Sequence, residues 1–123
     1  MADIEIRRGD VVRVNLSGAL GGEKQGDDRP CVVIQNDVGN KHSPLTIVAP
    51  ITDRRQDKHL PVQVPVNAAE LGPGGKDSVI ECGHIRTVDR DKRINRKLGV
   101  IATLPTETMT RVDAAVKVSL GVS

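Results

Sequence analysis

The sequence contains no phenylalanine, tyrosine or tryptophan, so its core has to be built from Val, Ile, Leu, Ala and two Met. The same absence excludes modules that hold single-stranded nucleic acid by stacking bases on aromatic rings. Any contact with a nucleic acid has to be ionic and hydrogen-bonded. No apolar stretch is long enough to span a membrane, and the first residues lack the apolar run of a signal peptide. We therefore expect a cytoplasmic protein with no membrane partner.

Motifs for metals and phosphates are also missing. Cys31 and Cys82 lie far apart and neither belongs to a C-x-x-C pair, which excludes zinc-ribbon and thioredoxin-like sites and favours two small core residues in a reducing compartment. No H-x-x-x-H pair, no G-x-x-x-x-G-K-[ST] loop and no G-x-S-x-G turn occurs. We expect no metal site and no cofactor, and nucleotide hydrolysis and serine esterase chemistry have no support.

Length and charge limit the remaining possibilities. A chain of 123 residues has enough apolar surface for one core but not for two, so residues 1–123 are expected to form a single domain. The 18 Lys and Arg against 16 Asp and Glu give a net charge of +2, too small for bulk attraction to a phosphate backbone. The stretch 86–97, however, carries six basic and two acidic residues. It is either an anion-attracting segment or a solvated turn.

Short β-branched runs separated by Gly, Pro, Asn and Asp predict a mainly β protein. The predicted strands lie at 10–16, 30–36, 44–51, 60–66, 78–81, 84–88 and 98–103. The second and third runs are almost continuously apolar, so we expect them at the centre of the sheet, covered on both faces.

The segments between and after these strands complete the expected fold. Residues 17–29 contain four Gly and three acids, which predicts a long loop of the kind that is usually functional in a small domain. Further loops are expected at 37–44 and 70–77. After Pro105 helical spacing predicts an amphipathic helix, ended by Gly121, whose apolar stripe comprises Met109, Val112, Val116 and Leu120. Together, the predicted strands, loops and helix indicate a bent antiparallel barrel or half-open sandwich with a C-terminal helix.

Two residues at strand ends could carry chemistry. Arg29 opens a predicted central strand, where a permanent charge could stabilise a phosphate in a transition state, or could simply pair with Asp27 or Asp28. Thr52 ends the next predicted strand, where its hydroxyl could donate to a phosphate oxygen or cap a turn. The residues alone leave both alternatives open.

Acid–base groups are harder to assign. The three histidines, His42, His59 and His84, lie in polar surroundings, and nothing in the sequence brings two of them together. Glu23 and Asp53 are either bases or solvated carboxylates.

Several strings of residues, taken in order, resemble the MazF/PemK family of toxins from type II toxin–antitoxin modules. They extend from about Arg8 to Leu104 and comprise R-G-D-V-V-R-V-N-L (8–16), R-P-C-V-V-I-Q-N-D-V-G-N (29–40), S-P-L-T-I-V-A-P-I-T (43–52), L-P-V-Q-V (60–64), K-D-S-V-I (76–80) and I-R-T-V-D-R (85–90). The resemblance implies a mainly β, SH3-like antiparallel barrel with a C-terminal helix, the plug fold that CcdB-like toxins share, in a homodimer. It also implies metal-independent, sequence-specific cleavage of single-stranded mRNA that leaves a 2′,3′-cyclic phosphate and a 5′-hydroxyl and inhibits translation and growth.

The resemblance assigns roles to particular residues. The family's catalytic Arg, directly before Pro, maps onto Arg29, and its catalytic Thr maps onto Thr52. The expected substrate-binding residues are Glu23, Gln25, Asn36, Asp53, Arg54, His84 and Arg86. The family's usual E-Q-G-G-x-R-P loop reads E-K-Q-G-D-D-R-P here, so its Glu and Gln align only with a shift.

The resemblance also implies a protein partner and leaves an alternative function. A mildly basic toxin of this kind is expected to bind a cognate antitoxin through an acidic, disordered tail. A gyrase-poisoning toxin, or an inactive module that binds RNA or antitoxin, would use the same fold. The presence of both Arg29 and Thr52 favours the nuclease over these two alternatives.

Overall fold

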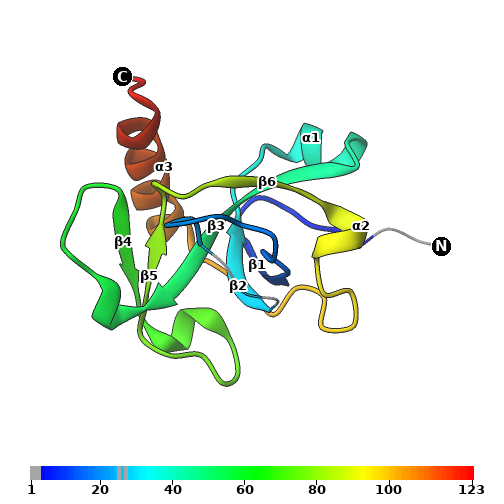
Figure 1. Ribbon diagram of the computed structural model, residues 1–123, viewed down its shortest axis with the longest axis horizontal. Helices are drawn as coiled ribbons and strands as arrows, with labels where there is room; N and C mark the ends of the chain where they lie inside the picture. The colour runs from blue at the N-terminus through cyan, green and yellow to red at the C-terminus, as the bar shows by residue number, and fades with distance from the viewer. Residues whose placement is uncertain (1–3, 25, 27) are drawn as a thin grey trace.

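The computed structural model describes residues 4–24, 26 and 28–123, which form a curled antiparallel sheet with one long helix at its end (Figure 1). The strands are β1 (Asp10–Val14), β2 (Arg29–Val33), β3 (Leu45–Asp53), β4 (Gln63–Val66), β5 (Ser78–Glu81), β6 (Arg86–Asp89) and β7 (Ala102–Thr103). The helices are α1 (Asp37–His42), α2 (Arg90–Arg93) and α3 (Thr106–Leu120), with 3-10 turns η1 (Arg54–Gln56) and η2 (Ala68–Leu71). This architecture confirms the predicted mainly β fold class and its C-terminal helix.

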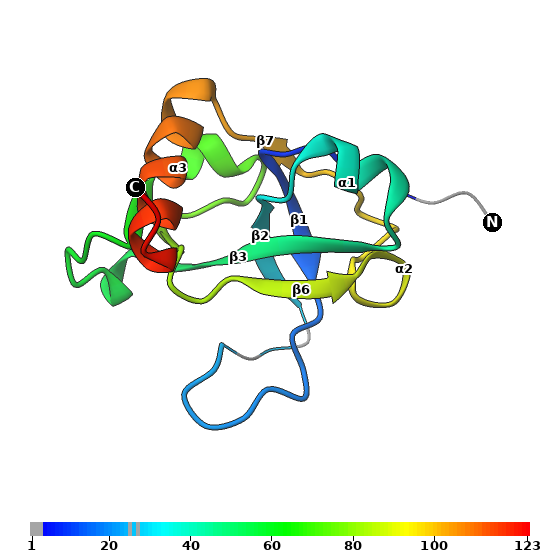
Figure 2. The same cartoon turned by 90° about the horizontal axis from the view of Figure 1, so that it is seen from above.

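The long central strand β3 joins the two halves of the curled sheet. The strand order is β4-β5-β3-β2-β1-β7, and β6 also pairs with β3. The first half of β3 pairs with β6, whereas its last three residues pair with β5. Figure 2 shows β3 crossing the molecule, with residues 15–24 of the 15–28 loop projecting beyond the ends of β1 and β2. Residues 22–24 of this loop and the C-terminal end of β3 line the same groove.

Two aliphatic clusters cover the two faces of the sheet. One cluster contains Val11, Val32 and Ala49 together with residues of α3, and the other contains Val12, Val33 and Val48. Side chains alternate between the faces of a strand, so β1, β2 and β3 supply both clusters. The predicted central position of the second and third strands, buried on both faces, is confirmed.

The C-terminal helix differs from its predicted stripe. Gly121 ends the helix in the left-handed conformation with φ of 69°, as expected for a C-terminal glycine. The buried side chains of the helix are those of Thr108, Met109, Val112 and Ala115, and the predicted Val116 is partly buried against the same cluster. The prediction for Leu120 is wrong, because it lies beyond the sheet and is 57% exposed.

Several predicted boundaries are also wrong, each for a local reason. The predicted strand 30–36 ends at Val33, and the predicted loop 37–44 contains α1, because the Asn36 side chain caps that helix by accepting from the Gly39 N–H at 2.8 Å. The predicted strand 60–66 begins at Gln63, which closes a turn by donating to the Leu60 carbonyl. The predicted strand 98–103 keeps only Ala102–Thr103.

Both cysteines are buried and unpaired. Burial raises the pKa of each thiol to about 12, so Cys31 and Cys82 stay protonated at neutral pH. They behave as the small core residues that the sequence predicted. Within the described residues, no helix has the length and apolar character to cross a membrane.

Arg90 is a buried charge that holds three segments together. Its guanidinium donates to the carbonyls of Asn40, Ser43 (3.0 Å) and Ile4 (2.6 Å).

We predict that Arg90→Met lowers the free energy of unfolding by about 3 kcal/mol, because it leaves buried carbonyls without donors. Chemical denaturation measures this loss. Arg7→Met, which removes an exposed Arg paired with Glu5, is the control and should change stability by less than about 0.5 kcal/mol.

Candidate active site

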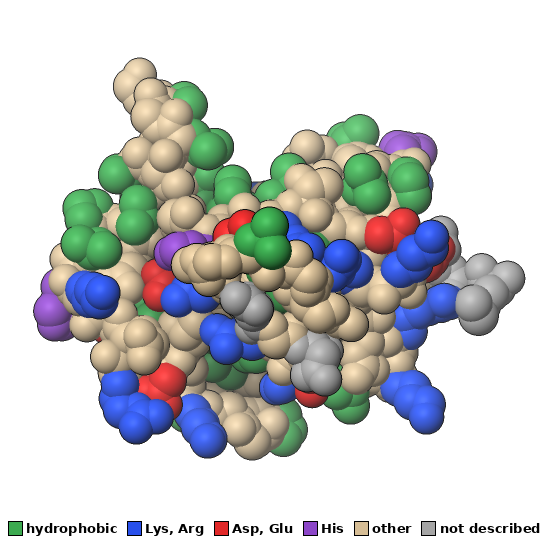
Figure 3. All heavy atoms as spheres, in the orientation of Figure 1, with side chains coloured by type: hydrophobic (Ala, Val, Ile, Leu, Met, Phe, Trp, Pro, Cys, Tyr) green, Lys and Arg blue, Asp and Glu red, His purple; other side chains and the backbone are tan. Residues whose placement is uncertain are grey.

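A groove of about 780 Å³ lies between the 15–28 loop, the start of β2, the end of β3 and the segment 71–78. Charged and polar side chains line it, and they comprise Arg13, Glu23, Lys24, Asp28, Arg29, Thr52, Asp53, Gln56, Lys76 and Ser78. In the orientation of Figure 1, Lys and Arg side chains are spread over the lower half of the surface (Figure 3). Four of the lining side chains are basic and three are acidic, so the groove has the size and a small positive excess of charge to take a segment of an anionic chain.

The register of the sheet brings Arg29 and Thr52 together. In the β2–β3 ladder Cys31 lies opposite Pro50 and Val32 lies opposite Ala49. Continuing this register by two residues places Arg29 opposite Thr52, because the two strands run antiparallel. Residues that oppose each other in this way have their side chains on one face. Both side chains line the groove, so the two residues predicted to be catalytic share one site.

The Arg29 side chain packs against the loop backbone along its methylene groups, and its Nε has no hydrogen-bond partner among the described residues. A Cβ built on Gly26 would lie only 2.8 Å from Cδ of Arg29, so the loop backbone packs directly against the side chain. The Nε of Arg29 is buried and has no hydrogen-bond partner among the described residues. The alternative of a local ion pair fails for Asp28, which binds Arg13 at 3.1 Å instead, and Asp27 lies outside the described residues. Arg29 is thus a fixed cation with an unused donor.

Thr52 is buried and touches a carboxylate that sequence reasoning did not identify. Its Oγ1 lies 3.5 Å from Oε2 of Glu81, which is only 4% exposed at the end of β5. Gln63 on β4 donates its Nε2 to both carboxylate oxygens at 3.2 and 3.3 Å, and Lys24 Nζ lies 3.7 Å from Oε2. The only signal in the sequence was an acid that ends the apolar run S-V-I-E.

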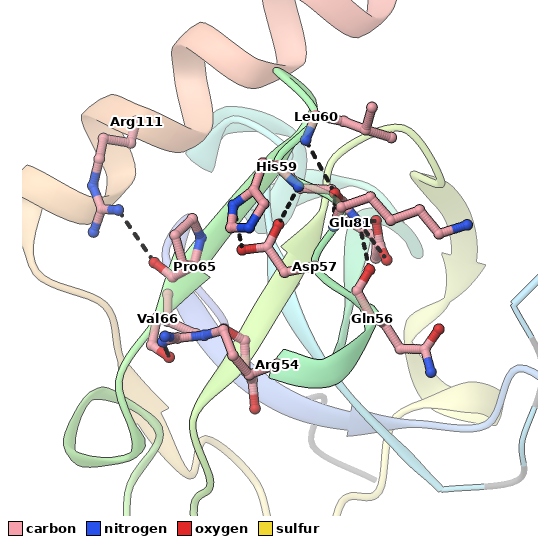
Figure 4. A network of polar contacts seen from close by, with 12 residues as sticks. Arg54, Gln56, Asp57, His59, Leu60, Pro65, Val66, Glu81 and Arg111 are labelled. Atoms are coloured by element: carbon pink, nitrogen blue, oxygen red, sulfur yellow. Dashed lines mark hydrogen bonds and ion pairs between the residues drawn. The ribbon is translucent and has the colours of Figure 1, made fainter.

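Asp53 and Arg54 follow Thr52 but have different surroundings. Asp53 lines the groove and caps η1, where hydrogen bonds from the backbone and side chain of Arg55 lower the pKa of its carboxyl. Arg54 donates to the carbonyls of Ser78 (3.0 Å) and Val66 (2.6 Å), and Figure 4 shows its guanidinium beside Val66. Arg54 is not among the groove-lining residues, since its donors hold β4 and β5 together.

The remaining predicted substrate-binding residues fall into three groups. His84 and Arg86 line a smaller hollow of about 250 Å³, which shares Glu23 and Lys24 with the main groove. Asn36 caps α1 and lines neither hollow. Gln25 lies outside the described residues. The structure therefore brings Glu23, Asp53, His84 and Arg86 to one continuous surface around Arg29 and Thr52.

No group of three or more His, Cys, Asp or Glu side chains within metal-binding reach occurs in the described part of the chain. Among the polar groups at the groove are the guanidinium of Arg29, whose Nε has no partner among the described residues, the buried hydroxyl of Thr52 and the Glu81 carboxylate behind it. Such a set can bind a phosphate and exchange protons with a hydroxyl.

Comparison with known proteins identifies the group to which this fold and groove belong. The sequence profile of the family described as PemK-like, MazF-like toxin of type II toxin-antitoxin system matches residues 7–120. The chain is 43% identical over 115 residues to Endoribonuclease EndoA of Bacillus subtilis (strain 168), covering 94% of each protein. The chain therefore belongs to the MazF/PemK toxin family.

Solved structures agree with this assignment. The crystal structure of MazF (Form-I) from Deinococcus radiodurans matches with a TM-score of 0.79 and 26% identity, over 98% of this chain and all of that chain (100%). An endoribonuclease in complex with its cognate antitoxin from Mycobacterial species matches with a TM-score of 0.74, over 96% of this chain and 97% of that chain. At 18% identity the second match bears on the fold alone.

Proposed function

We propose that this toxin is an endoribonuclease that cuts single-stranded mRNA in the cytoplasm at particular short sequences without a metal ion, and so inhibits translation and growth. The RNA's own 2′-hydroxyl attacks the adjacent phosphate, which leaves a 2′,3′-cyclic phosphate and a 5′-hydroxyl. The endoribonuclease activity of the 43% identical Bacillus subtilis relative supports this proposal.

The observation that carries the proposal is the buried Nε of Arg29 in the groove, which has no hydrogen-bond partner among the described residues. A buried donor without a partner is costly, so it is retained where a ligand completes it. An Arg fork binds two oxygens of one phosphate, and its charge stabilises the extra negative charge of the pentacoordinate transition state. The stem contact with Gly26 fixes the fork before substrate arrives. Arg29 therefore supplies preorganised charge to a phosphate lying across the groove.

The surrounding residues fit an extended, single-stranded substrate. The main groove and the hollow at His84 and Arg86 meet at Glu23 and Lys24, which gives a track longer than one nucleotide. Because the chain has no aromatic residues, bases are held by hydrogen bonds and apolar contacts rather than by stacking. We assign recognition of the flanking bases to Glu23, His84 and Arg86 in this track.

The decisive experiment incubates the purified protein with a long mRNA in EDTA and maps the ends of the products. The proposal expects fragments with cyclic phosphate and 5′-hydroxyl ends at a small set of recurring sequences, and no cleavage of DNA of the same sequence, which lacks the attacking hydroxyl. Relaxation and cleavage of supercoiled DNA by gyrase are assayed in parallel. Gyrase poisoning with intact RNA would support the alternative toxin, and loss of cleavage in EDTA would contradict metal independence.

We also predict a homodimer. One chain offers only a shallow groove, and large aliphatic side chains lie exposed on its described surface, among them Leu20, Val38, Leu60 and Leu98. A two-fold pair would cover apolar area and extend the RNA track. Sedimentation velocity at micromolar concentration should show a species of twice the 13.2 kDa chain mass. A monomer under these conditions would contradict the prediction.

The cognate antitoxin is expected to bind through an acidic, disordered tail that competes with RNA for the basic groove. Its dissociation constant should rise with ionic strength, because screening weakens attraction between the tail and residues such as Arg13, Lys24 and Arg29. Titrations at 50, 150 and 400 mM salt measure this dependence. A complex that still cuts RNA would show that the tail does not cover the groove.

A further inference from the structure

Glu81 is a buried carboxylate behind the groove, and the roles given above to Arg29 and Thr52 do not use it. It is only 4% exposed, and its contacts come from separate segments, which are Thr52 on β3, Gln63 on β4 and Lys24 in the 15–28 loop. Figure 4 shows Glu81 within the polar network of the turn from Gln56 to Leu60. Burying a carboxylate costs solvation free energy unless hydrogen bonds or charges compensate for it, so the partners of Glu81 indicate its role.

The hydrogen bonds fix which partners of Glu81 donate. The amide orientation of Gln63 is set by its other contacts, because its Oε1 accepts from the N–H groups of Lys58 and Leu60 and its Nε2 donates to the Gln56 carbonyl. Gln63 therefore presents an N–H to Glu81, and the ammonium of Lys24 can only donate. A carboxylate that faces these donors accepts from Thr52 as well. The hydroxyl proton of Thr52 thus points at Glu81.

This direction changes what Thr52 offers to a substrate. A hydroxyl has one proton and two lone pairs, so a Thr52 that donates to Glu81 presents lone pairs to the groove. It can then accept a hydrogen bond, whereas the sequence expectation was that it donates to a phosphate oxygen. In RNA the donor next to the scissile phosphate is the 2′-hydroxyl. DNA has no such donor.

We propose that Thr52 and Glu81 together take the proton of the attacking 2′-hydroxyl, a step that rests on the RNA cleavage proposed above. The O2′–H bond breaks as O2′ bonds to phosphorus, its proton passes to Oγ1 of Thr52, and the proton of Thr52 passes to Oε2 of Glu81. The bond from phosphorus to the 5′ oxygen breaks, and that oxygen takes a proton from water. Glu81 then returns its proton through Thr52 to solvent. Thr52 touches the substrate, and Glu81 is a positioning residue that acts through it.

The relay supplies a base through Thr52, which shares the groove with Arg29. A guanidinium carries N–H donors and no acceptor, so Arg29 stabilises charge but does not accept the proton of the 2′-hydroxyl. The Thr52–Glu81 distance of 3.5 Å is long for a hydrogen bond, and such bonds shorten when substrate fills an active site. The arrangement separates the two tasks, with charge stabilisation on β2 and proton acceptance on β3 and β5.

The test compares Glu81→Gln with Lys24→Met in the full chain. The substrate is an RNA oligonucleotide spanning a cleavage site mapped by the mRNA digest, and kcat and KM are measured in EDTA. Glu81→Gln keeps the size of the side chain and removes the base, so kcat should fall by about a hundredfold or more while KM changes by less than about threefold. Lys24→Met removes the ion pair but keeps the relay, so it should mainly raise KM. Equal effects of the two variants on kcat would mean that Glu81 only anchors the loop.

Variants of Thr52 test the relay from its other end. Thr52→Val should lower kcat by about a hundredfold, Thr52→Ser should recover most of the rate, and Thr52→Val combined with Glu81→Gln should be no slower than the slower single variant, because the two residues act as a unit. If the losses of kcat in the two single variants multiply in the double variant, the relay is overturned. If Glu81→Gln does not fold, Glu81→Asp tests the relay instead. This variant keeps the negative charge that pairs with Lys24 and moves the carboxylate away from Thr52, so kcat should fall. A wild-type rate in that variant would also overturn the relay.

The relay and the underlying function fail in different ways. An unmodified chain that leaves RNA intact contradicts the proposed function. RNA cleavage that is lost in Arg29→Ala but kept in Glu81→Gln leaves the function standing and overturns only the relay.

Discussion

Replacing Arg29 with alanine is expected to lower RNA cleavage by about a thousandfold or more, with little change in folding. The Nε of Arg29 has no partner among the described residues, so the substitution breaks no hydrogen bond there that the folded chain needs. The variant loses only the preorganised charge at the scissile phosphate. The rate is measured under single turnover on the mapped RNA substrate, and folding is followed by chemical denaturation.

Arg55→Ala is the matched control for this loss. Arg55 also lies near the groove, where it pairs with Asp53 at 3.0 Å, but its side chain is 86% exposed and does not line the groove. We expect its rate to stay within about threefold of the wild type, since a surface charge of this kind is screened by solvent and salt. Equal losses in the two variants would mean that Arg29 acts only through the general positive field. Full activity of Arg29→Ala would contradict the mechanism.

The sequence was sufficient to place Arg29 and Thr52 at strand ends, but not to place them opposite each other. Arg29 lies opposite Thr52 because Cys31 pairs with Pro50, and this pairing depends on the register between β2 and β3. The apolar runs predicted the two strands well because burial on both faces leaves a continuous hydrophobic signal. Register has no such local signal, and the resemblance to MazF/PemK toxins assigned a catalytic role to both residues without giving the alignment of the two strands.

The partners of Glu81 and Arg54 could not be predicted from the sequence around them. Glu81 looked like an acid at the end of a strand, and its function depends on partners 57, 29 and 18 residues away in the chain, namely Lys24, Thr52 and Gln63. Arg54 was expected to bind substrate, and its guanidinium instead donates to the carbonyls of Val66 on β4 and Ser78 on β5. In both cases the side chain's partners come from non-local pairing, which composition and spacing do not encode.

Substituting Gly26 with alanine is expected to lower the cleavage rate by about a hundredfold without touching a catalytic group. The new Cβ would lie 2.8 and 2.9 Å from Cδ and Cγ of Arg29, closer than two carbons can approach, so the Arg29 side chain has to move. A displacement of about 1 Å is enough to lose this much rate when the group is a preorganised donor. Single-turnover rates measure the loss, which should appear in kcat rather than in KM.

Gly18→Ala separates this displacement from backbone strain. Gly18 has φ of 88° and Gly26 has φ of 127°, so alanine is strained at both positions. A Cβ at Gly18, however, meets no atom within 4 Å, so the control incurs the strain and leaves Arg29 in place. We expect both variants to lose about 1 kcal/mol of stability, and only Gly26→Ala to lose activity. If the two variants were equally slow, the rigidity of the whole 15–28 loop, rather than the contact between Gly26 and Arg29, would set the rate.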